Sequence, residues 1–503
     1  MSETLLLGID IGGSVTKASV FSATGELRVS AGEASKVVTG DGGVVERDMD
    51  ELWSAVISAV GTCFNDPGIS PDQIAAIGVT GFGNGLFLLD GDGRPVRNAI
   101  AAVDSRARDI VHEWRAAGFE SEMHDKTLQR FWSGQPLPLL KWLQRFEPDA
   151  LQSAAHFLLS KDYVRFRLTG LAQAERSDLG SGGLWDPVAG HVPTDLFDTL
   201  GLGEAASLFQ PDQILEPWDI AGEVSEQAAQ QTGLPQGIPV AAGTLDGLAG
   251  MLGSGVTELH HLSIMSGTWG IQQVFSTDKD PTGELFQSLA PLGSDRFLLV
   301  ESSPNSMSNF DWFLRNLHVG RDRELTADDY AELDRVIAST TLQPEDPVAF
   351  IPHVYSTPRH PTCSGSLVGL TPDASPDRLV RAVCEGVAFE HRVLIERLDG
   401  VDWSLAPILS GGVTKSSAWP QLFADVLGVD VTTPDSDELG TRGAVMLAAV
   451  ATGIYPDLTA AAEAMAGLGE RWEPRDEQVA TLGARYESFK QQRTTALYKE
   501  SEK

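Results

Sequence analysis

The chain has 503 residues, 42% of them hydrophobic and 21% charged, which is enough apolar material for two or more compact domains. Its 37 Lys and Arg against 70 Asp and Glu give a net charge of -33, which disfavours binding to nucleic acids and to anionic membranes. Three cysteines, no basic leader and no long apolar run predict a soluble cytoplasmic protein without disulfides, zinc sites or membrane spans.

The first predicted element is a glycine-rich hairpin at residues 5–21 (LLLGIDIGGSVTKASVF). An apolar run precedes Gly12, Gly13 and Ser14 and a stretch of β-type alternation follows them, so they form a turn whose bare backbone N–H groups phosphate oxygens could approach. Asp10 precedes the turn and could hold a metal ion against those phosphates. Taken alone, the pattern fits an ordinary hairpin with an ion-paired aspartate better.

Strands and helices alternate after this hairpin, which indicates an α/β domain with a mixed sheet. Residues 25–34 add a third strand, and Asp48 begins a helix with Glu51 as its capping-box partner. Residues 74–80 (IAAIGVT) form a buried strand that leads into the loop GFGNG. Further helices are expected at residues 135–146, 148–155 and 158–170, and a loop-rich region at 171–235.

The opening pattern returns in the middle of the chain. A strand over residues 238–246 (IPVAAGTLD) ends on Asp246, and residues 259–276 (LHHLSIMSGTWGIQQVFS) then form strand, Ser-Gly-Thr turn and strand. Two hairpins of one design, about 250 residues apart, indicate a duplicated fold with one copy opening each half. The repeat makes Gly267 and Thr268 a second candidate phosphate turn.

A third glycine turn lies in the second half, within residues 407–428 (PILSGGVTKSSAWPQLFADVLG). Gly411 and Gly412 separate a strand from a helix, so the turn would also supply a helix N-terminus for an anion. Residues 440–453 form a helix of small residues that could pack tightly against a neighbour. Neither a Walker lysine motif nor a GxGxxG after a strand is present, so phosphate binding is assigned to the three turns.

These motifs together resemble the FGGY family of carbohydrate kinases, in the actin-like ATPase superfamily, over nearly the whole chain. GIDIGGSVTKA resembles the family's first phosphate motif, SGTWG its second, LSGGVTKSSAWPQLFADVLG its adenosine motif and VAAGTLDG the segment with the catalytic aspartate. The resemblance implies an α/β fold of two duplicated actin-like (ribonuclease H-like) domains with a cleft between them. The implied ranges are an N-terminal domain at 1–250, a C-terminal domain at 257–455 and a helical tail at 456–503.

The resemblance also implies Mg-ATP as phosphoryl donor and a small sugar or polyol as acceptor. Asp246 would accept the proton of the attacking hydroxyl, and Asp10 would bind Mg²⁺. The other implied contacts are phosphates at Gly12, Gly13, Ser14, Gly267 and Thr268, adenosine at Gly411, Gly412 and Lys415, and sugar at Gly83, Asn84, Asp104 and Asp246.

Several of these residues keep a second interpretation. Asp246 could instead cap the segment that follows it, and Lys17 could be a solvated lysine or a phosphate contact. Asp104 could form an ion pair with Arg106 rather than contact sugar. Lys415 could be a surface charge of the following helix.

Sugar specificity is set by less family-typical stretches. VERDMDELW and WSGQPLPLLKWLQRFEPDAL resemble most the kinases of L-xylulose and 3-keto-L-gulonate, with D-xylulose kinases next. Asn84 stands where xylulose kinases carry the histidine of a Met-His pair, which weakens the D-xylulose assignment. An erythritol- or glycerol-type polyol kinase is one alternative, and a non-kinase actin-like ATPase or sugar-responsive regulator is another. A homodimer is left open.

Overall fold

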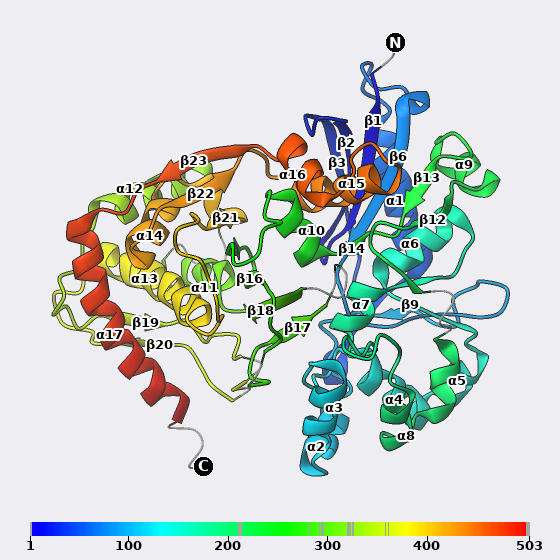
Figure 1. The fold of residues 1–503 in the computed structure, drawn as a ribbon. Coiled ribbons are helices and arrows are strands. Elements are labelled where there is room, and N and C mark those ends of the chain that lie inside the picture. Colours follow the sequence, from blue (N-terminus) through cyan, green and yellow to red (C-terminus); the bar gives the residue numbers. More distant parts are fainter. Residues whose placement is uncertain are drawn as a thin grey trace. The chain divides into compact units, whose positions relative to one another are not determined.

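The computed structural model describes residues 3–209, 214–280, 282–290, 292, 296–318, 323, 326–357, 359–360 and 362–498. Within them the chain forms two compact units, each with a mixed β-sheet and packed helices (Figure 1). The first unit comprises Met1–Glu258, Ser276–Leu299 and Glu438–Gly467, and the second comprises Leu259–Phe275, Val300–Asp437 and Leu468–Lys503. Both units are discontinuous in sequence, whereas the sequence prediction used continuous ranges.

The strands are β1 (Leu5–Ile11), β2 (Val15–Ser22), β3 (Leu27–Ala34), β4 (Val38–Gly40), β5 (Val44–Arg47), β6 (Ile74–Gly81), β7 (Phe87–Leu89), β8 (Ala99–Ile100), β9 (His156–Leu158), β10 (Ala174–Glu175), β11 (Ile214–Leu215), β12 (Ile220–Glu223), β13 (Pro239–Ala241), β14 (Thr244–Leu245), β15 (Ser263–Ser266), β16 (Gly270–Ser276), β17 (Gln287–Leu289), β18 (Phe297–Ser303), β19 (Ala349–Ile351), β20 (Ser366–Val368), β21 (Ile408–Ser410), β22 (Val431–Pro434) and β23 (Leu468–Trp472).

The helices are α1 (Met49–Cys63), α2 (Arg108–Ala116), α3 (Phe119–Thr127), α4 (Pro136–Phe146), α5 (Pro148–Ser153), α6 (Ser160–Thr169), α7 (Arg176–Ser181), α8 (Thr194–Thr199), α9 (Glu226–Thr232), α10 (Asp246–Gly253), α11 (Met307–Phe313), α12 (Ala327–Ser339), α13 (Pro376–Ile395), α14 (Ala418–Leu427), α15 (Leu439–Ala451), α16 (Leu458–Met465) and α17 (Asp476–Tyr498). Among the described residues, no helix combines the length and the apolar character that crossing a membrane requires.

The sheet of the first unit has the order β12-β13-β6-β1-β2-β3, with β14 also paired to β6 (Figure 1). The expected hairpin is confirmed, because β1 runs antiparallel to β2. On its other side β1 runs parallel to β6, the predicted buried strand. The meander continues to β3, which is antiparallel to β2.

Two helices cover opposite faces of this sheet, because successive residues of a strand point to opposite sides. Leu5, Leu7 and Ile9 of β1 belong to the core cluster that includes α1. Leu6, between them, belongs to the cluster that includes α15. The N-cap of α1 is Asp48, as predicted, and its carboxylate accepts hydrogen bonds from two backbone N–H groups.

Glycines on the sheet allow α15 to approach it closely. A Cβ on Gly8 or on Gly78 would stand 2.5 and 2.0 Å, respectively, from backbone carbonyl oxygens of α15. Real side chains do not tolerate such distances, so the tight packing predicted for residues 440–453 is confirmed. This packing returns a segment from late in the chain to the end of β1.

The second unit repeats the local topology of the first. Its sheet includes the order β18-β16-β15-β21-β22-β23. β15 is antiparallel to β16 and parallel to β21, as β1 is to β2 and β6. The predicted duplication of the hairpin is therefore confirmed, together with a parallel neighbour that the repeat did not reveal.

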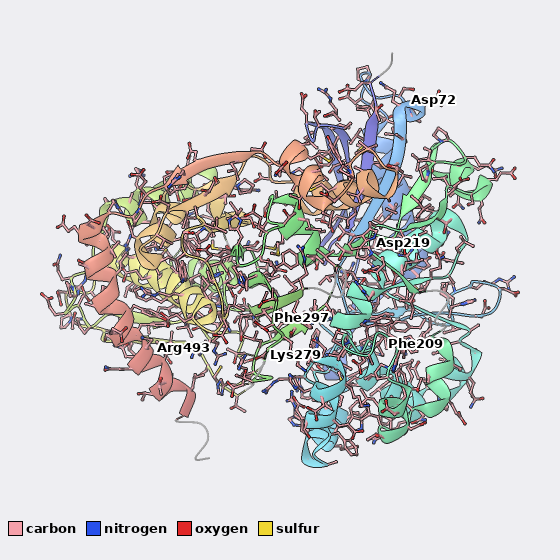
Figure 2. All side chains as sticks on the ribbon, viewed as in Figure 1. Asp72, Phe209, Asp219, Lys279, Phe297 and Arg493 are labelled. Atoms are coloured by element: carbon pink, nitrogen blue, oxygen red, sulfur yellow. The ribbon has the colours of Figure 1, made fainter. Side chains whose placement is uncertain are left out.

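Helix α13, which begins at Pro376, packs against several other helices of the second unit, among them α17 at the end of the described chain. Arg493 of α17, labelled in Figure 2, donates hydrogen bonds of 2.7 and 2.8 Å to Glu390 of α13. Tyr486 of α17 and Phe389 of α13 are buried with ring centroids 5.5 Å apart.

Residues 171–235, for which a loop-rich region was expected, contain more regular structure than predicted. They include α7, α8 and α9 and the strands β10, β11 and β12, while residues 210–213 lie outside the described part. Glu175 and Ser225 accept hydrogen bonds from the first turns of α7 and α9, and Gly233 ends α9 with φ 75°. Polar residues and glycines here begin and end short helices instead of excluding them.

Candidate active site

The first glycine turn, between β1 and β2, exposes its backbone. Gly12 N–H donates to Val15 O (3.0 Å), and Ser35 N–H donates to Ser14 O (2.8 Å). A Cβ on Gly12 would lie 2.6 Å from Val15 O, whereas a Cβ on Gly13 would meet nothing within 4 Å. The turn is therefore tight at Gly12 and open at Gly13, as the approach of an anion to backbone N–H groups requires.

Two carboxylates meet where the parallel strands of the first unit end. Asp10 on β1 lies opposite Thr80 on β6. Thr80 in turn lies opposite Thr244 on β14, two residues before Asp246. The strands thereby bring Asp10 and Asp246 close enough for the charge of one to act on the pKa of the other.

The strand expected over residues 238–246 is interrupted before it reaches Asp246. Gly243 separates β13 from β14 with φ 75°, and a Cβ there would lie 1.8 Å from Val79 O. Asp246 is the first residue of α10 and accepts a hydrogen bond of 2.7 Å from Gly247 N–H. Leu245 and not Asp246 is the N-cap of α10, so the Gly247 bond holds the carboxylate in the first turn of the helix without making Asp246 its cap residue.

Both carboxylates have raised pKa values. Burial, and secondly the charge of Asp246, raises the pKa of Asp10 to about 7. Burial also raises the pKa of Asp246 to about 6, against the lowering effect of the backbone N–H groups of Gly247 and Asp246. Oδ1 of Asp10 has no hydrogen-bond partner within the described part of the chain.

These two carboxylates suit a divalent cation that is shared with phosphates. No cluster of three or more His, Cys, Asp or Glu that could hold a metal is found in the described residues. Mg²⁺ does not require such a cluster, since one or two carboxylates commonly bind it together with phosphate oxygens. The unpaired Oδ1 of Asp10 is the atom that fits this role.

The start of α15 contacts Asp10 from a distant part of the sequence. Lys17 Nζ lies 3.1 Å from both carboxylate oxygens of Glu438. A Cβ on Gly440 would lie 2.5 Å from Asp10 Oδ2, so a larger residue does not fit without displacing the carboxylate. Lys17 is therefore ion-paired, and any phosphate contact would be shared with Glu438.

The loop with Gly83 and Asn84 lies against α7. Asn84 adopts φ 66° and its Nδ2 donates to Ser181 Oγ (3.1 Å). Its Oδ1 is buried with no hydrogen-bond partner among the described residues. A Cβ on Gly83 would lie 3.1 Å from Asp178 Oδ1 and 3.8 Å from Cβ of Leu245, the residue before the candidate base. The structure thus brings Gly83 and Asn84 into the neighbourhood of that base.

The carboxylate of Asp104 is bonded inside the protein. It accepts hydrogen bonds from Val45 N–H (2.6 Å) and from the Arg106 guanidinium (2.8 and 3.0 Å). Arg106 also pairs with Glu46 (2.8 Å) and lies 4.9 Å from the centroid of Trp142. The ion pair that the sequence left open is present, and a sugar contact at Asp104 stays a prediction.

Neutral side chains hold the second turn, between β15 and β16. Ser266 Oγ lies 3.0 Å from Ser306 Oγ, which lies 2.9 Å from His391 Nε2. Gln272 Nε2 donates to His391 Nδ1. Burial lowers the pKa of His391 to about 4, so the ring is neutral near pH 7. The turn at residues 267–268 is therefore positioned by hydrogen bonds and not by charge.

The third turn adjoins the second. A Cβ on Gly411, whose φ is 94°, would lie 2.6 Å from Ser266 O. The predicted strand, glycine turn and helix are confirmed as β21, Gly411 and α14, with a 3-10 turn at Gly412–Lys415 between Gly411 and the helix. Gly412 and Lys415 are exposed, which leaves the proposed adenosine contacts sterically open.

A buried ion cluster behind the Gly83 loop was missed by the sequence analysis. Lys161 is fully buried, and its carboxylate partners are Asp162 (2.7 Å), Asp178 (2.8 Å) and Glu175 (3.3 Å). Burial opposes the charge of Lys161, but the three carboxylates together raise its pKa. Strings of charged residues usually predict surface, so no local signal pointed to this cluster.

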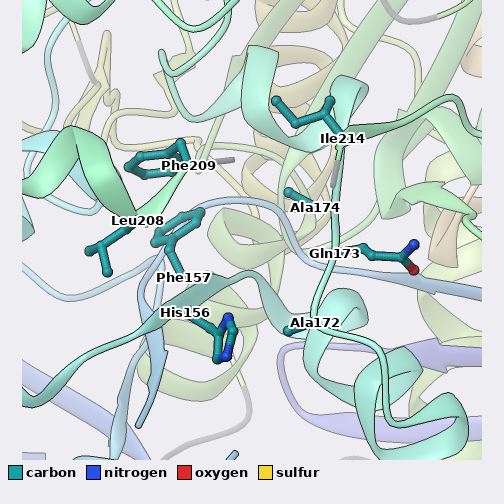
Figure 3. Close-up of a pocket in the computed structure, with 8 residues that line it drawn as sticks. All are labelled: His156, Phe157, Ala172, Gln173, Ala174, Leu208, Phe209 and Ile214. Carbon is teal, nitrogen blue, oxygen red and sulfur yellow. The ribbon is translucent and has the colours of Figure 1, made fainter. Parts of the chain in front are cut away.

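Figure 3 shows a pocket in the first unit that is lined by none of the site residues described above. His156 and Phe157 on β9 line it together with Phe209, whose ring centroid lies 4.7 Å from that of Phe157. None of its lining residues is a predicted site residue, and we assign it no role in the chemistry.

Comparisons with known proteins match the whole chain. The model of the FGGY family of carbohydrate kinases, N-terminal domain, covers residues 5–253, and the C-terminal domain model covers residues 262–452. The chain is 31% identical to "Probable L-xylulose kinase" of Pasteurella multocida (strain Pm70), over 98% of each chain. It is 29% identical to "L-xylulose/3-keto-L-gulonate kinase" of Escherichia coli (strain K12), over 90% of each. Identity to "Xylulose kinase" of Bacillus subtilis (strain 168) is 25%, over 96% of each.

Solved structures show the same fold. A ligand-bound xylulose kinase from Lactobacillus acidophilus superposes with a TM-score of 0.87 at 22% identity, over 98% of each chain. The xylulose kinase from Rhodospirillum rubrum gives a TM-score of 0.85 at 24% identity, over 98% of each chain. At these identities the likeness establishes the architecture of the chain and leaves its substrate open.

Proposed function

The chain belongs to the FGGY family of carbohydrate kinases, and from that premise we propose that it transfers the γ-phosphoryl group of ATP to a hydroxyl of L-xylulose or a closely related ketose. As a sugar kinase it has two actin-like α/β domains. Relatives named for L-xylulose are more similar to it than the Bacillus xylulose kinase is, which supports this choice of sugar. Use of ATP also fits a cytoplasmic location.

The observation that carries the proposal is the position of Asp246, beside Asp10 and next to the Gly83 loop. We assign Asp246 the proton of the attacking hydroxyl. Its pKa of about 6 leaves it ionised at pH 7 yet basic enough to take a proton as the hydroxyl oxygen attacks phosphorus. The Gly247 N–H bond restrains its orientation.

Asp10 is the proposed Mg²⁺ ligand, through the oxygen that has no protein partner. When bound, the ion would offset the charge of the β- and γ-phosphates. Backbone N–H groups of Gly13 and Ser14 would bind phosphate oxygens of the same nucleotide, beside Gly12, whose own N–H already donates to Val15 O. The proposals for the second unit are phosphate contacts at Gly267 and Thr268 and adenosine contacts at Gly411, Gly412 and Lys415.

Sugar recognition is assigned to the Gly83 loop. The unpaired Oδ1 of Asn84 can accept a hydrogen bond from a sugar hydroxyl, whereas its Nδ2 is occupied by Ser181. Gly83 leaves space beside Asp178 that any side chain would fill. Asp104 would take part through the ion pair that holds Arg106 in place. An amide does not titrate, so binding through Asn84 would not vary with pH.

A coupled assay of ADP release tests this function. Purified protein with Mg-ATP is offered L-xylulose, D-xylulose, 3-keto-L-gulonate, erythritol and glycerol, with a reaction lacking Mg²⁺ as control. We expect the highest kcat/KM for L-xylulose and loss of turnover without Mg²⁺. Preference for erythritol or glycerol would replace the ketose with a polyol, and turnover of none of the five by folded protein would refute the proposal.

A further inference from the structure

Arg47, the last residue of β5, is a buried cation without a carboxylate partner among the described residues. Arg47 is only 4% exposed, and its Nε and Nη1 have no hydrogen-bond partner in the described part of the chain. Burial lowers the pKa of its guanidinium. Burying guanidinium N–H groups without partners costs folding free energy, so a functional reason for this arrangement is expected.

The surroundings of Arg47 connect the first glycine turn to the sugar loop. Its Nη2 donates to the carbonyl oxygen of Gly13, in the middle of the turn. The guanidinium carbon lies 5.0 Å from the ring centroid of Phe82, the residue before Gly83. Beyond the turn, a Cβ on Gly13 would find open space, so a ligand has room there.

Other buried arginines of the chain contrast with Arg47. Arg106 pairs with Asp104 and Glu46, and Arg381, which is 3% exposed, donates to Glu385 (2.8 Å). The chain has 70 acidic residues against 37 basic ones, so carboxylates are abundant. An arginine that lacks one beside a candidate phosphate turn is therefore suited to an anion that comes with the substrates.

We propose that Arg47 is a further catalytic residue, which donates hydrogen bonds to the phosphoryl group during its transfer; this rests on the function proposed above. As the bond from the sugar oxygen to the γ-phosphorus forms, the bond to the β,γ-bridging oxygen breaks and ADP leaves. The hydroxyl proton passes to Asp246. Charge then spreads over three equatorial oxygens, which the planar guanidinium matches better than a lysine ammonium does.

We assign a phosphoryl group and not a sugar carboxylate to Arg47, because Arg47 bonds to Gly13, in the turn for which phosphate binding is proposed. Contact with Phe82 places the guanidinium on the side of that turn where the acceptor loop begins. A phosphoryl group that passes from the nucleotide to the sugar would account for the contacts of Arg47 with both Gly13 and Phe82.

Three variants at this position provide the test. R47M keeps the length without the charge, R47K keeps the charge without the fork, and R47Q keeps hydrogen bonding alone. With saturating ATP and L-xylulose we expect R47M to lose about 10²-fold or more in kcat, as for other arginines that act on a transferring phosphoryl group, with KM for the sugar within about threefold. R47K should recover only part of that loss.

A binding measurement separates catalysis from folding. ADP with aluminium fluoride mimics the planar phosphoryl group, and we expect R47M and R47K to weaken its binding while ADP alone binds as in the wild type. R381M is the matched control, since Arg381 is as buried but already paired; it should lower the melting temperature and leave kcat within about threefold.

Each outcome has a distinct meaning. If the wild-type protein phosphorylates no ketose, the proposed function is refuted, while the binding of ADP with aluminium fluoride still tests the role of Arg47. Wild-type activity retained in R47M, or equal aluminium fluoride binding in the folded R47K, would refute the role of Arg47. A defect confined to 3-keto-L-gulonate would overturn the phosphoryl assignment in favour of a sugar carboxylate.

Discussion

The two hairpin turns share a backbone design and differ in the side chains around them. The first has Asp10 with an unpaired oxygen and the buried cation of Arg47 beside it. The second is held by the hydroxyl of Ser306 and the neutral imidazole of His391. Duplication thus preserved the topology but not the electrostatics. We infer that the first turn takes part in chemistry, whereas the second positions a ligand.

Replacing the candidate base, Asp246, should cause the largest loss of activity, because the chemistry is assigned to the side of the first turn. In Asp246→Asn the carboxylate is lost while size and the bond to Gly247 are kept, and we expect kcat to fall by about 10²–10⁴-fold. Steady-state kinetics with Asp72→Asn, at an exposed aspartate, as control measures the effect. A fall of less than tenfold would remove Asp246 from the mechanism.

The same variant should be at least as stable as the wild type at pH 8. Burial raises the pKa of Asp246 to about 6, above its unfolded value, so its favourable contribution exists at low pH and is lost as the pH rises through 6. Asparagine carries no charge to bury. Thermal melts at pH 8 check this, and a large loss of stability would show that the ionised carboxylate is itself structural.

Crowding Asp10 should have the next largest effect. A methyl group in Gly440→Ala would collide with Asp10 Oδ2, which is 2.5 Å from the position of the new Cβ. Displacement of a reacting group by about 1 Å can cost about 10²-fold, and we expect at least a tenfold loss of kcat. Gly61→Ala is the control, since a Cβ there meets nothing within 4 Å of its site in α1. Unchanged kcat in Gly440→Ala would mean that Asp10 tolerates the shift.

Acid pH should lower activity by protonating Asp246 near the first turn, while the hydrogen bonds of the second turn stay intact. Below about pH 6 Asp246 becomes protonated, so kcat/KM should fall about tenfold per pH unit. The apparent pKa will belong to the Asp10 and Asp246 pair, because their charges interact. A pH profile with circular dichroism at each point tests this; a wild-type profile that stays flat to pH 5 would contradict it.

Changes at the second turn should be the mildest. His391→Phe removes the bonds to Ser306 and Gln272. Ser306 keeps its bond to Ser266, but Gln272 Nε2 is left buried and unsatisfied among the described residues, which costs about 1–3 kcal/mol of stability. We expect KM for ATP to rise roughly three- to tenfold as the turn loosens. KM for the sugar should not change, and His391→Gln should recover part of the effect. An equal rise in both KM values would show general loosening instead.

Sequence patterns predicted the elements whose signals are local. The hairpin at β1 and β2 follows from alternating apolar residues around Gly12, and its repeat at β15 and β16 follows from the same pattern. The cap at Asp48 was likewise visible within one turn of α1. The prediction was wrong where one residue type has two uses: glycine and polar residues in 171–235 begin and end short helices as well as forming loops.

Local patterns were enough to predict the strands, the glycine turns and the family, and they singled out Asp10 and Asp246 as candidates. Tertiary structure decided what surrounds them. Lys17 and Glu438 meet across 421 positions, and Gly440 is required because α15 packs against Asp10. A short window of sequence holds hydrophobic period and turn chemistry, but burial and charge pairing depend on residues that come together only when the chain folds. Arg47 illustrates this, because nothing in the residues next to it in sequence shows that its side chain is buried with Nε and Nη1 unpartnered among the described residues.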